Sequence, residues 1–277
     1  MTSLVTPEQL AGILDGVTVL DVRYQLGRAD GHEQFLSGHV PGAVYVDLST
    51  DLADPPADPV DERGRHPLPS PERFAAAMAR AGVRRERPVV VYDDWSSMAA
   101  TRAWWLLTFH GHPDVRVLDG GWSWWTRTGA VIETGEPDFE QGVEQGDFRA
   151  DPGHLPVVDA DGAAQVARDG VLLDARAAER FRGEVEPVDP VAGHVPGAVN
   201  VPTALNHEDG RFRSLSELAD LYAMVGEHGD VAAYCGSGVT ATHDLFALHL
   251  LGRRAALFPA SWSGWVSDDT RPVATDA

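Results

Sequence analysis

Residues 234–240 of this 277-residue chain read Tyr-Cys-Gly-Ser-Gly-Val-Thr. They follow a short apolar run, Val231 to Tyr234, and precede a run in which apolar residues recur with the period of a helix. This pattern predicts a strand, a tight loop and a helix, with Cys235 at the end of the strand. Two glycines allow the backbone to fold closely around the sulfur, and the following helix directs the positive end of its dipole toward the loop. The setting favours a reactive thiolate over an inert buried thiol, the usual state of a lone cysteine.

Length and composition indicate two globular domains. Of the 277 residues 43% are hydrophobic and 23% charged, enough for two domains that each bury a core. The formal net charge of −20 argues against a nucleic-acid partner, whose binding surface is basic. Neither a run of about 18 apolar residues nor a basic-then-apolar leader is present. We therefore expect no membrane partner, no secretion signal and a cytoplasmic location.

The cysteine and lysine content limits which side chains can take part in a reaction. Cys235 is the sole cysteine, so the chain has neither an internal disulfide nor a second thiol that could resolve a modified Cys235. A covalent intermediate on this sulfur needs an outside acceptor. All 22 Lys and Arg residues are arginine. Lysine is therefore excluded from every role in the chemistry.

The same order of motifs occurs twice along the chain. The corresponding pairs of segments are 20–23 and 173–176, 38–44 and 193–199, 89–92 and 231–234, and 120–125 and 260–265. The second pair reads Gly-His-Val-Pro-Gly-Ala-Val in both copies. A repeat of this length indicates a duplicated domain, because the repeats of solenoid proteins span about 20 to 50 residues.

Within each copy, apolar runs of strand length alternate with helical patterns. Such alternation predicts parallel strands joined by crossover helices. The predicted fold class is therefore α/β, with tandem duplicated domains that are each a mainly parallel sheet with helices on both faces. The segment from Glu133 to Pro156 is rich in Gly, Glu, Asp and Pro and lacks periodicity. We place an N-terminal domain at 1–135, a linker at 136–156 and a C-terminal domain at 157–277.

Some element boundaries are marked by capping residues. Thr6 caps a predicted helix from Pro7 to about Leu14, and Ser214 forms a capping box with Glu217. Residues 51–69, rich in Pro and Asp, are expected to be an irregular excursion.

The repeat assigns the chemistry to one half of the chain. Cys235 corresponds to Asp93 in the first copy, where residues 92–97 read Tyr-Asp-Asp-Trp-Ser-Ser. An aspartate cannot carry out thiolate chemistry. We therefore expect the C-terminal half to be reactive, and the first half to cover and stabilise the site.

These residues together resemble the two-domain rhodanese family of sulfurtransferases over essentially the whole chain. The resemblance rests on the joint order of Gly-His-Val-Pro-Gly-Ala in both halves, Asp93 in place of a cysteine, and the loop at Cys235. It implies two rhodanese-like domains of which the second is catalytic, and no cofactor. It also implies a persulfide on Cys235 that carries sulfur from a small anionic donor to cyanide, a small thiol or a thioredoxin-like protein.

The cysteine loop is most similar to that of the 3-mercaptopyruvate sulfurtransferases, because thiosulfate-preferring members carry cationic residues after the cysteine. The resemblance assigns the loop amides to binding of the thiolate, the transferred sulfur and the leaving anion. These amides belong to Gly236, Gly238, Val239 and Thr240. Two half-reactions through one covalent intermediate predict ping-pong kinetics.

The resemblance also implies a proton relay beside the cysteine. Ser237 matches the loop serine of the mercaptopyruvate enzymes, and His66 matches the histidine of their relay by its place before Leu-Pro. For the third member, alignment gives Ser49 where the family has an aspartate, with Asp47 and Asp51 nearby. A solvated loop imidazole is the alternative interpretation of His66.

Arg180 matches a family arginine that holds the anionic group of the donor, a role that suits a planar guanidinium. The alternative is a surface arginine paired with Glu179 or Glu184. Mercaptopyruvate enzymes have a second arginine a few residues later, and this chain has none in the corresponding segment 184–190. Arg182 is a candidate replacement.

Other polar residues receive structural interpretations. His39 and His194 occupy equivalent places in both halves, so we expect them to fix a turn rather than to react. The Asp and Arg of 20–23 and 173–176 are expected to be local ion pairs. The His-Gly-His segment at 110–112 lacks clustered partners, so no metal site is predicted.

Three other functions stay open. The nearest is a thiosulfate sulfurtransferase with the same nucleophile. A phosphatase of a related domain type would have a longer cysteine loop with an arginine before its helix, and this loop is short and lacks that arginine. A non-catalytic sulfur carrier or interaction module would have Cys235 loaded by another enzyme and would bind partners through its acidic surface.

Overall fold

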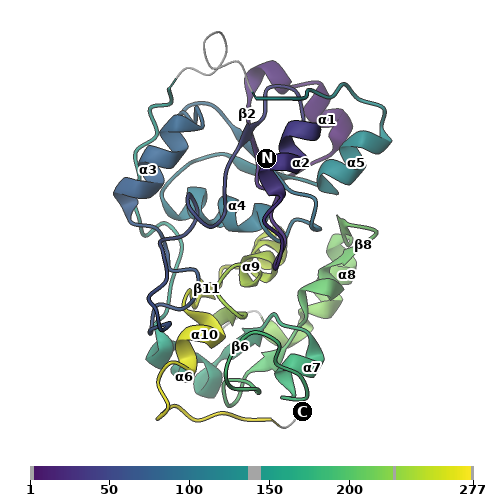
Figure 1. The fold of residues 1–277 in the computed structure, drawn as a ribbon. Helices are drawn as coiled ribbons and strands as arrows, with labels where there is room; N and C mark the ends of the chain where they lie inside the picture. Colours follow the sequence, from purple (N-terminus) through teal and green to yellow (C-terminus); the bar gives the residue numbers. More distant parts are fainter. Residues whose placement is uncertain (1–2, 137–144, 227–228, 276–277) are drawn as a thin grey trace. The chain divides into compact units, whose positions relative to one another are not determined.

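The computed structural model describes residues 3–136, 145–226 and 229–275, which form two compact units. The first unit contains Met1–Ala53, Pro69–His154 and Asp209–Phe212, as far as these are described. The second contains Asp54–Leu68, Leu155–Glu208 and Arg213–Ala277, within the same ranges. Figure 1 labels elements of both units.

The first unit is built on a five-stranded sheet in which all paired strands are parallel. Its strands, in spatial order, are β1 (Leu4–Val5), β5 (Val115–Leu118), β4 (Val89–Tyr92), β2 (Thr18–Asp21) and β3 (Val44–Tyr45). Its helices are α1 (Pro7–Ala11), η1 (Leu14–Gly16), α2 (Gly31–Ser37), α3 (Pro71–Arg80), α4 (Ala100–Phe109) and α5 (Gly121–Arg127). The strand β9 (Arg211–Phe212) groups with this unit.

Helices cover both faces of the first sheet. Leu10 of α1, Phe35 of α2 and Trp125 of α5 pack with Val19 and Val90 in one core. α4 packs against β4 and β5, and Figure 1 shows α3 and α4 on the other side of the sheet from α1, α2 and α5. A strand buried on both faces can be apolar throughout, as the Val-Val-Val-Tyr sequence of β4 is.

The second unit repeats this design with four parallel strands. They are, in spatial order, β11 (Ala256–Leu257), β10 (Val231–Tyr234), β6 (Val171–Asp174) and β7 (Val199–Asn200). Its other elements are α6 (Ala160–Asp169), α7 (Ala178–Phe181), η2 (Thr203–Asn206), β8 (His207–Glu208), α8 (Leu215–Leu221), η3 (Ala223–Val225), α9 (Ala241–Leu250) and α10 (Ser261–Trp265). Val157 makes a single parallel bridge to Leu257, in the place that β1 takes in the first unit.

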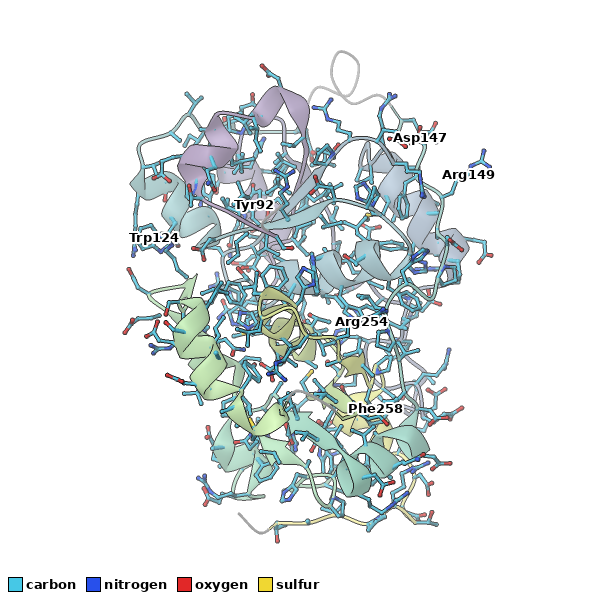
Figure 2. The ribbon with its side chains drawn as sticks, turned by 180° about the vertical axis from the view of Figure 1, so that it is seen from behind. Tyr92, Trp124, Asp147, Arg149, Arg254 and Phe258 are labelled. Carbon is cyan, nitrogen blue, oxygen red and sulfur yellow. The ribbon has the colours of Figure 1, made fainter. Side chains whose placement is uncertain are left out.

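The core of the second unit mirrors that of the first. Val166 of α6 packs with Trp262 and Trp265 of α10 and with Phe258, which Figure 2 labels in this unit. α9 packs against β10 and β11. The two tryptophans of α10 therefore pack in the core. The predicted class of tandem parallel α/β domains is confirmed.

One buried contact is repeated in both copies. Tyr92 ends β4 and Tyr234 ends β10, and their hydroxyls accept the N–H groups of Val40 and Val195, each at 3.1 Å. Both phenols are fully buried, and Figure 2 labels Tyr92 inside the first unit. This hydrogen bond holds the Gly-His-Val-Pro turn against the end of the strand that precedes the cysteine or aspartate loop.

Several predicted boundaries are confirmed. Strands β4 and β10 occupy the predicted ranges, and the capping boxes at Thr6 and Ser214 are both formed. The first helix ends at Ala11 instead of about Leu14, because Gly12 caps it and a separate 3₁₀ turn follows. No helix in the described ranges is long and apolar enough to cross a membrane.

Two short segments group with the unit formed by the other half of the sequence. Residues 54–68 group with the second unit, where a β-carbon at Gly64 would lie 2.4 Å from the carbonyl oxygen of Ala260. Glycine is therefore required there, and its φ of +79° is a second reason. The segment Asp209–Phe212 groups with the first unit, where Arg211 Nε donates to Asp119 at 2.8 Å.

Residues 145–154 of the predicted linker group with the first unit, and Leu155 and Pro156 group with the second. Phe148 is buried, and the N–H groups of Gly146 and Asp151 donate to the carbonyls of Ala79 and His110. Residues 137–144 of the predicted linker lie outside the described residues. The domain boundaries placed at 135 and 156 stay a prediction.

Candidate active site

Cys235 lies directly after β10, at the start of the tight loop that precedes α9. Its side chain is buried, and Sγ accepts the N–H of Gly238 at 3.2 Å. Gly238 has a φ of +78°, and a β-carbon on it would lie 2.2 Å from the carbonyl oxygen of Pro259. Both constraints demand glycine, so this residue allows the loop to close over the sulfur.

The backbone of Cys235 is held from the start of α10. Its N–H donates to Ser261 Oγ at 3.0 Å, and that hydroxyl donates to the carbonyl of Phe258 at 3.0 Å. Ser261 is fully buried and has a φ of +54°, which is unfavourable for a residue with a side chain. The first copy has Gly121 at the equivalent place, with a φ of +56°. The sequence signal for this role of Ser261 is that a serine stands where the first copy has a glycine. The role was not predicted from the sequence.

The corresponding loop of the first unit holds an anion of its own. The carboxylate of Asp93 accepts four backbone N–H groups at 2.7 to 2.9 Å. The donors belong to Trp95, Ser97, Ala99 and Ala100. Burial raises the pKa of Asp93 to about 6, and these four donors oppose that rise, so the carboxyl is mainly ionised at pH 7. The strand-loop-helix unit of this fold therefore binds a negative charge in its first copy.

His66 and Ser237 meet within the second unit. His66 Nδ1 lies 2.8 Å from Ser237 Oγ. His66 reaches this place because residues 54–68 are anchored on α10, where the N–H of Arg65 donates to Ser263 Oγ at 3.1 Å. A solvated loop imidazole, the alternative interpretation of His66, would not make this contact.

The three candidates for a third relay member lie in the first unit and have local contacts there. Asp47 Oδ1 accepts the N–H groups of Ser49 and Thr50 at 2.8 and 3.0 Å. Asp51 accepts from Arg80 Nη2 at 2.8 Å. Burial raises the pKa of Asp51. The assignment of a carboxylate to the relay stays a prediction.

Arg180 lies beside the cysteine loop. A β-carbon built on Gly236 would lie 3.6 Å from both terminal nitrogens of Arg180 and 3.0 Å from Arg65 Nη2. Arg180 Nη2 donates to Glu186 at 2.6 Å and to Asp189 at 3.4 Å. Its carboxylate partners are therefore not the Glu179 or Glu184 of the alternative interpretation, and sequence reasoning missed both Glu186 and Asp189.

Val239 and Thr240 complete the loop and lead into α9. Val239 is buried, and its carbonyl accepts the Thr242 hydroxyl at 2.7 Å. Thr240 precedes the first turn of α9. The convergence of several amides on Sγ stays a prediction, with the Gly238 N–H as the contact that the structure gives.

Comparison with known proteins shows the family to which this chain belongs. The model of the rhodanese-like domain matches residues 6–128 and, a second time, residues 159–268. This chain belongs to the rhodanese-like domain family. It is 47% identical over 279 residues to the putative thiosulfate sulfurtransferase SseB of Mycobacterium tuberculosis, covering 98% of this chain and 96% of the relative.

Two further relatives of this rhodanese-like chain are named for 3-mercaptopyruvate instead of thiosulfate. The probable 3-mercaptopyruvate sulfurtransferase of Pseudomonas aeruginosa is 43% identical over 283 residues, with 98% of each chain covered. The crystal structure of SseA from Escherichia coli, described as a 3-mercaptopyruvate sulfotransferase, has a TM-score of 0.81 at 32% identity and covers 95% of this chain and 100% of its own. The predicted family is confirmed, and so is the predicted class of enzyme, a sulfurtransferase.

The repeated histidines of this rhodanese-like chain have the structural role that was predicted. His39 Nδ1 lies 2.9 Å from the carbonyl of Phe35, and His194 Nδ1 lies 2.7 Å from that of Phe181. Each imidazole also stacks on the ring of the phenylalanine whose carbonyl it contacts. The predicted Asp-Arg ion pairs are also formed, at 2.6 Å in both copies.

Proposed function

We propose that this enzyme takes a sulfane sulfur from 3-mercaptopyruvate onto Cys235 and passes it to a thiol or to cyanide. The observation that carries the choice of donor is the 2.8 Å contact between His66 Nδ1 and Ser237 Oγ, two residues from the cysteine. Sulfur abstraction from mercaptopyruvate leaves an enolate that needs a proton. A serine hydroxyl backed by an imidazole is a group that can deliver it.

In the first half-reaction the Cys235 thiolate attacks the donor's sulfur. The new S–S bond forms as the donor's C–S bond breaks, and the electron pair of that bond leaves on the enolate of pyruvate. Ser237 gives its proton to the enolate carbon, and the persulfide proton restores the hydroxyl through His66. The products are pyruvate and a Cys235 persulfide anion, and the loop amide of Gly238 lies where it can stabilise a negative charge on the sulfur.

In the second half-reaction an acceptor attacks the outer sulfur of the persulfide. Cyanide leaves as thiocyanate, and a thiol leaves as a hydropersulfide, with the Cys235 thiolate restored in both cases. The nature of the thiol acceptor, whether a small molecule or a thioredoxin-like protein, stays a prediction, as does the cytoplasmic location.

Thiosulfate is the second candidate donor, because the SseB relative that carries that name shares 47% identity with this chain. Its leaving group, sulfite, needs no proton, so the His66–Ser237 pair would have no task. Steady-state rates with each donor, cyanide as acceptor and purified full-length protein decide between them. We expect a higher kcat/KM with 3-mercaptopyruvate and none with Cys235→Ser. A higher value with thiosulfate would contradict the proposed donor, and activity in Cys235→Ser would contradict the nucleophile.

A further inference from the structure

One residue of α10, Ser263, binds the backbone next to both members of the His66–Ser237 pair. Its N–H donates to the carbonyl of Gly236 at 2.9 Å, and its Oγ accepts the N–H of Arg65 at 3.1 Å. Gly236 directly precedes Ser237 in the sequence. Arg65 in turn directly precedes His66. Ser263 therefore joins the two stretches of backbone that carry the serine hydroxyl and the imidazole.

The hydroxyl of Ser263 is held in the orientation that this contact needs. Its own proton goes to the carbonyl of Ala260, three residues earlier, at 3.2 Å. A lone pair of Oγ is therefore left to accept the N–H of Arg65. Because Ser263 is only 3% exposed, solvent has little access to replace the hydroxyl as the acceptor.

Two glycines bring the backbone of residues 54–68 directly onto α10. A β-carbon on Gly64 would lie 2.9 Å from Ser263 Oγ, and one on Gly264 would lie 2.8 Å from the carbonyl oxygen of Glu62. A side chain at either position would push the segment and the helix apart. The segment that carries His66 is therefore fitted to α10 through backbone contacts on both sides of the Arg65 hydrogen bond.

α10 also holds the cysteine loop, through bonds that do not involve the Ser263 hydroxyl. The N–H of Trp262 donates to the carbonyl of Cys235 at 3.0 Å, and the N–H of Cys235 donates to Ser261 Oγ at 3.0 Å. The bond from Ser263 to Gly236 uses the backbone N–H. Loss of the Ser263 hydroxyl would therefore leave these contacts to the cysteine loop in place.

The side chain of Arg65 is likewise held without this hydroxyl. Arg65 Nη1 forms an ion pair with the carboxylate of Asp189, which is buried. The backbone N–H of Arg65 and its guanidinium thus have separate partners. The Ser263 hydroxyl consequently acts on the backbone that leads to His66.

The equivalent serine of the first copy makes different contacts. Ser123 follows Gly121 by two residues, as Ser263 follows Ser261. The N–H and Oγ of Ser123 both donate to Asp94 Oδ1, at 3.0 and 2.6 Å, and the residue is exposed. Its hydroxyl thus binds its own loop, whereas the hydroxyl of Ser263 accepts from a segment of the other half of the sequence. The bridging contact is therefore made by the serine of the copy that carries the cysteine.

We propose that Ser263 is the positioning residue of the His66–Ser237 pair, and that it thereby favours sulfur donors whose leaving group must be protonated. This inference rests on the proposed function and adds a residue that acts through His66. The imidazole can restore the serine proton only while it lies within hydrogen-bond reach of the hydroxyl. A misplacement of about 1 Å can lower a rate about 100-fold, so a backbone contact one residue from His66 is sufficient to control this step.

The first test measures the burst of pyruvate at saturating 3-mercaptopyruvate, which reports the first half-reaction. Ser263→Ala removes the acceptor of the Arg65 N–H and should slow this burst about tenfold, with little change in the half-saturating donor concentration or in sulfite release from thiosulfate. Ser123→Ala removes the equivalent hydroxyl of the first copy and is the matched control, for which we expect wild-type values. An unchanged burst in Ser263→Ala would overturn the proposal, and so would equal losses with both donors.

A double-mutant cycle tests whether Ser263 acts through the imidazole. In the His66→Ala background, Ser263→Ala should cause no further slowing of the burst, because the group that it positions is already absent. A further loss of the same size would mean that Ser263 acts by another route, and would overturn the proposal. A rise in the half-saturating donor concentration with an unchanged burst rate would assign Ser263 to the Arg65 guanidinium, which would contradict the proposal as well.

Amide hydrogen exchange measured by NMR is a readout that needs no donor. The Arg65 N–H should exchange slowly in the wild type and in Ser123→Ala, and about fivefold faster in Ser263→Ala, as expected for the loss of one hydrogen bond. Fast exchange of this N–H in the wild type would overturn the proposal, even if Ser263→Ala does not fold. A wild type that releases no pyruvate would refute the proposed function, and slow exchange of its Arg65 N–H would still support the placing of His66 by Ser263.

Discussion

His66 Nδ1 lies 2.8 Å from Ser237 Oγ, although 171 positions separate the two residues along the chain. The contact exists within one unit because residues 54–68 of the first repeat group with the second. The first half of the sequence thus supplies a polar side chain to the loop that carries the only cysteine, although its own copy of the loop holds Asp93.

Ser237→Ala should slow turnover of 3-mercaptopyruvate about 100-fold and leave thiosulfate turnover within a few fold. The reason is that only the first donor leaves an enolate that needs a proton, and proton delivery is typically worth 10²- to 10⁴-fold. Initial rates with both donors test this. Equal losses with the two donors would show that Ser237 shapes the loop and does not deliver a proton.

His66→Ala and Ser237→Ala should not be additive. If the imidazole acts through the serine hydroxyl, the double variant loses little more than the Ser237→Ala variant, as expected for residues in one hydrogen-bonded pair. The measurement is kcat for 3-mercaptopyruvate in the four members of the double-mutant cycle. Independent, multiplicative losses would separate the two residues into different roles.

Ser261 allows a matched pair of substitutions. Ser261→Ala leaves the Cys235 N–H without its acceptor and keeps a β-carbon at a φ of +54°, so we expect a loss of about 1–3 kcal/mol in the free energy of unfolding. Ser261→Gly removes the same hydroxyl but relieves the backbone strain, so its loss should be about 1 kcal/mol smaller. Chemical denaturation of both variants checks the difference. A glycine variant as unstable as the alanine variant would show that the strain is absent.

Asp244 makes stability depend on pH. This residue of α9 is fully buried, and burial raises its pKa to about 8 while Asn206 donates to its Oδ1 at 2.7 Å. A folded pKa above the unfolded value means that the folded state keeps a proton that the unfolded chain has lost. The contribution of Asp244 to stability is therefore complete below about pH 4 and is lost as the pH rises to about 8.

The comparison of wild type with Asp244→Asn isolates this contribution. The difference in their unfolding free energies should change with pH by up to about 1.4 kcal/mol per unit between pH 5 and 8, with the wild type losing stability as the pH rises. Denaturant titrations at several pH values give this slope. Parallel curves for the two proteins would mean that Asp244 titrates normally.

Much of the fold could be predicted from the sequence because its signals are local. Runs such as 89–92 and 231–234 are apolar and short, and both formed strands at those residues. The order of repeated motifs also indicated the duplication, and the position of Cys235 at a strand end followed from the apolar run before it.

The parts that could not be predicted depend on long-range pairing. Arg65 and Asp189 are 124 positions apart, and neither periodicity nor capping marks two residues that form an ion pair at such a separation. The grouping of residues 54–68 with the second unit has the same cause, since their Pro- and Asp-rich composition indicates only an irregular segment. The role of Ser261 could have been predicted from the sequence. Alignment of the two copies places this serine opposite Gly121, which indicates an unusual backbone conformation.

The proposed function requires Cys235 to accept sulfur directly from a small donor. The most direct test is the intact mass of the purified protein after it is mixed with 3-mercaptopyruvate and freed of excess donor, with Cys235→Ser as control. We predict a gain of one sulfur atom on Cys235 in the wild type, discharged by cyanide or a thiol, and no gain in the control. A wild type whose mass is unchanged with every sulfane donor, or a control that gains the same mass, would contradict the account.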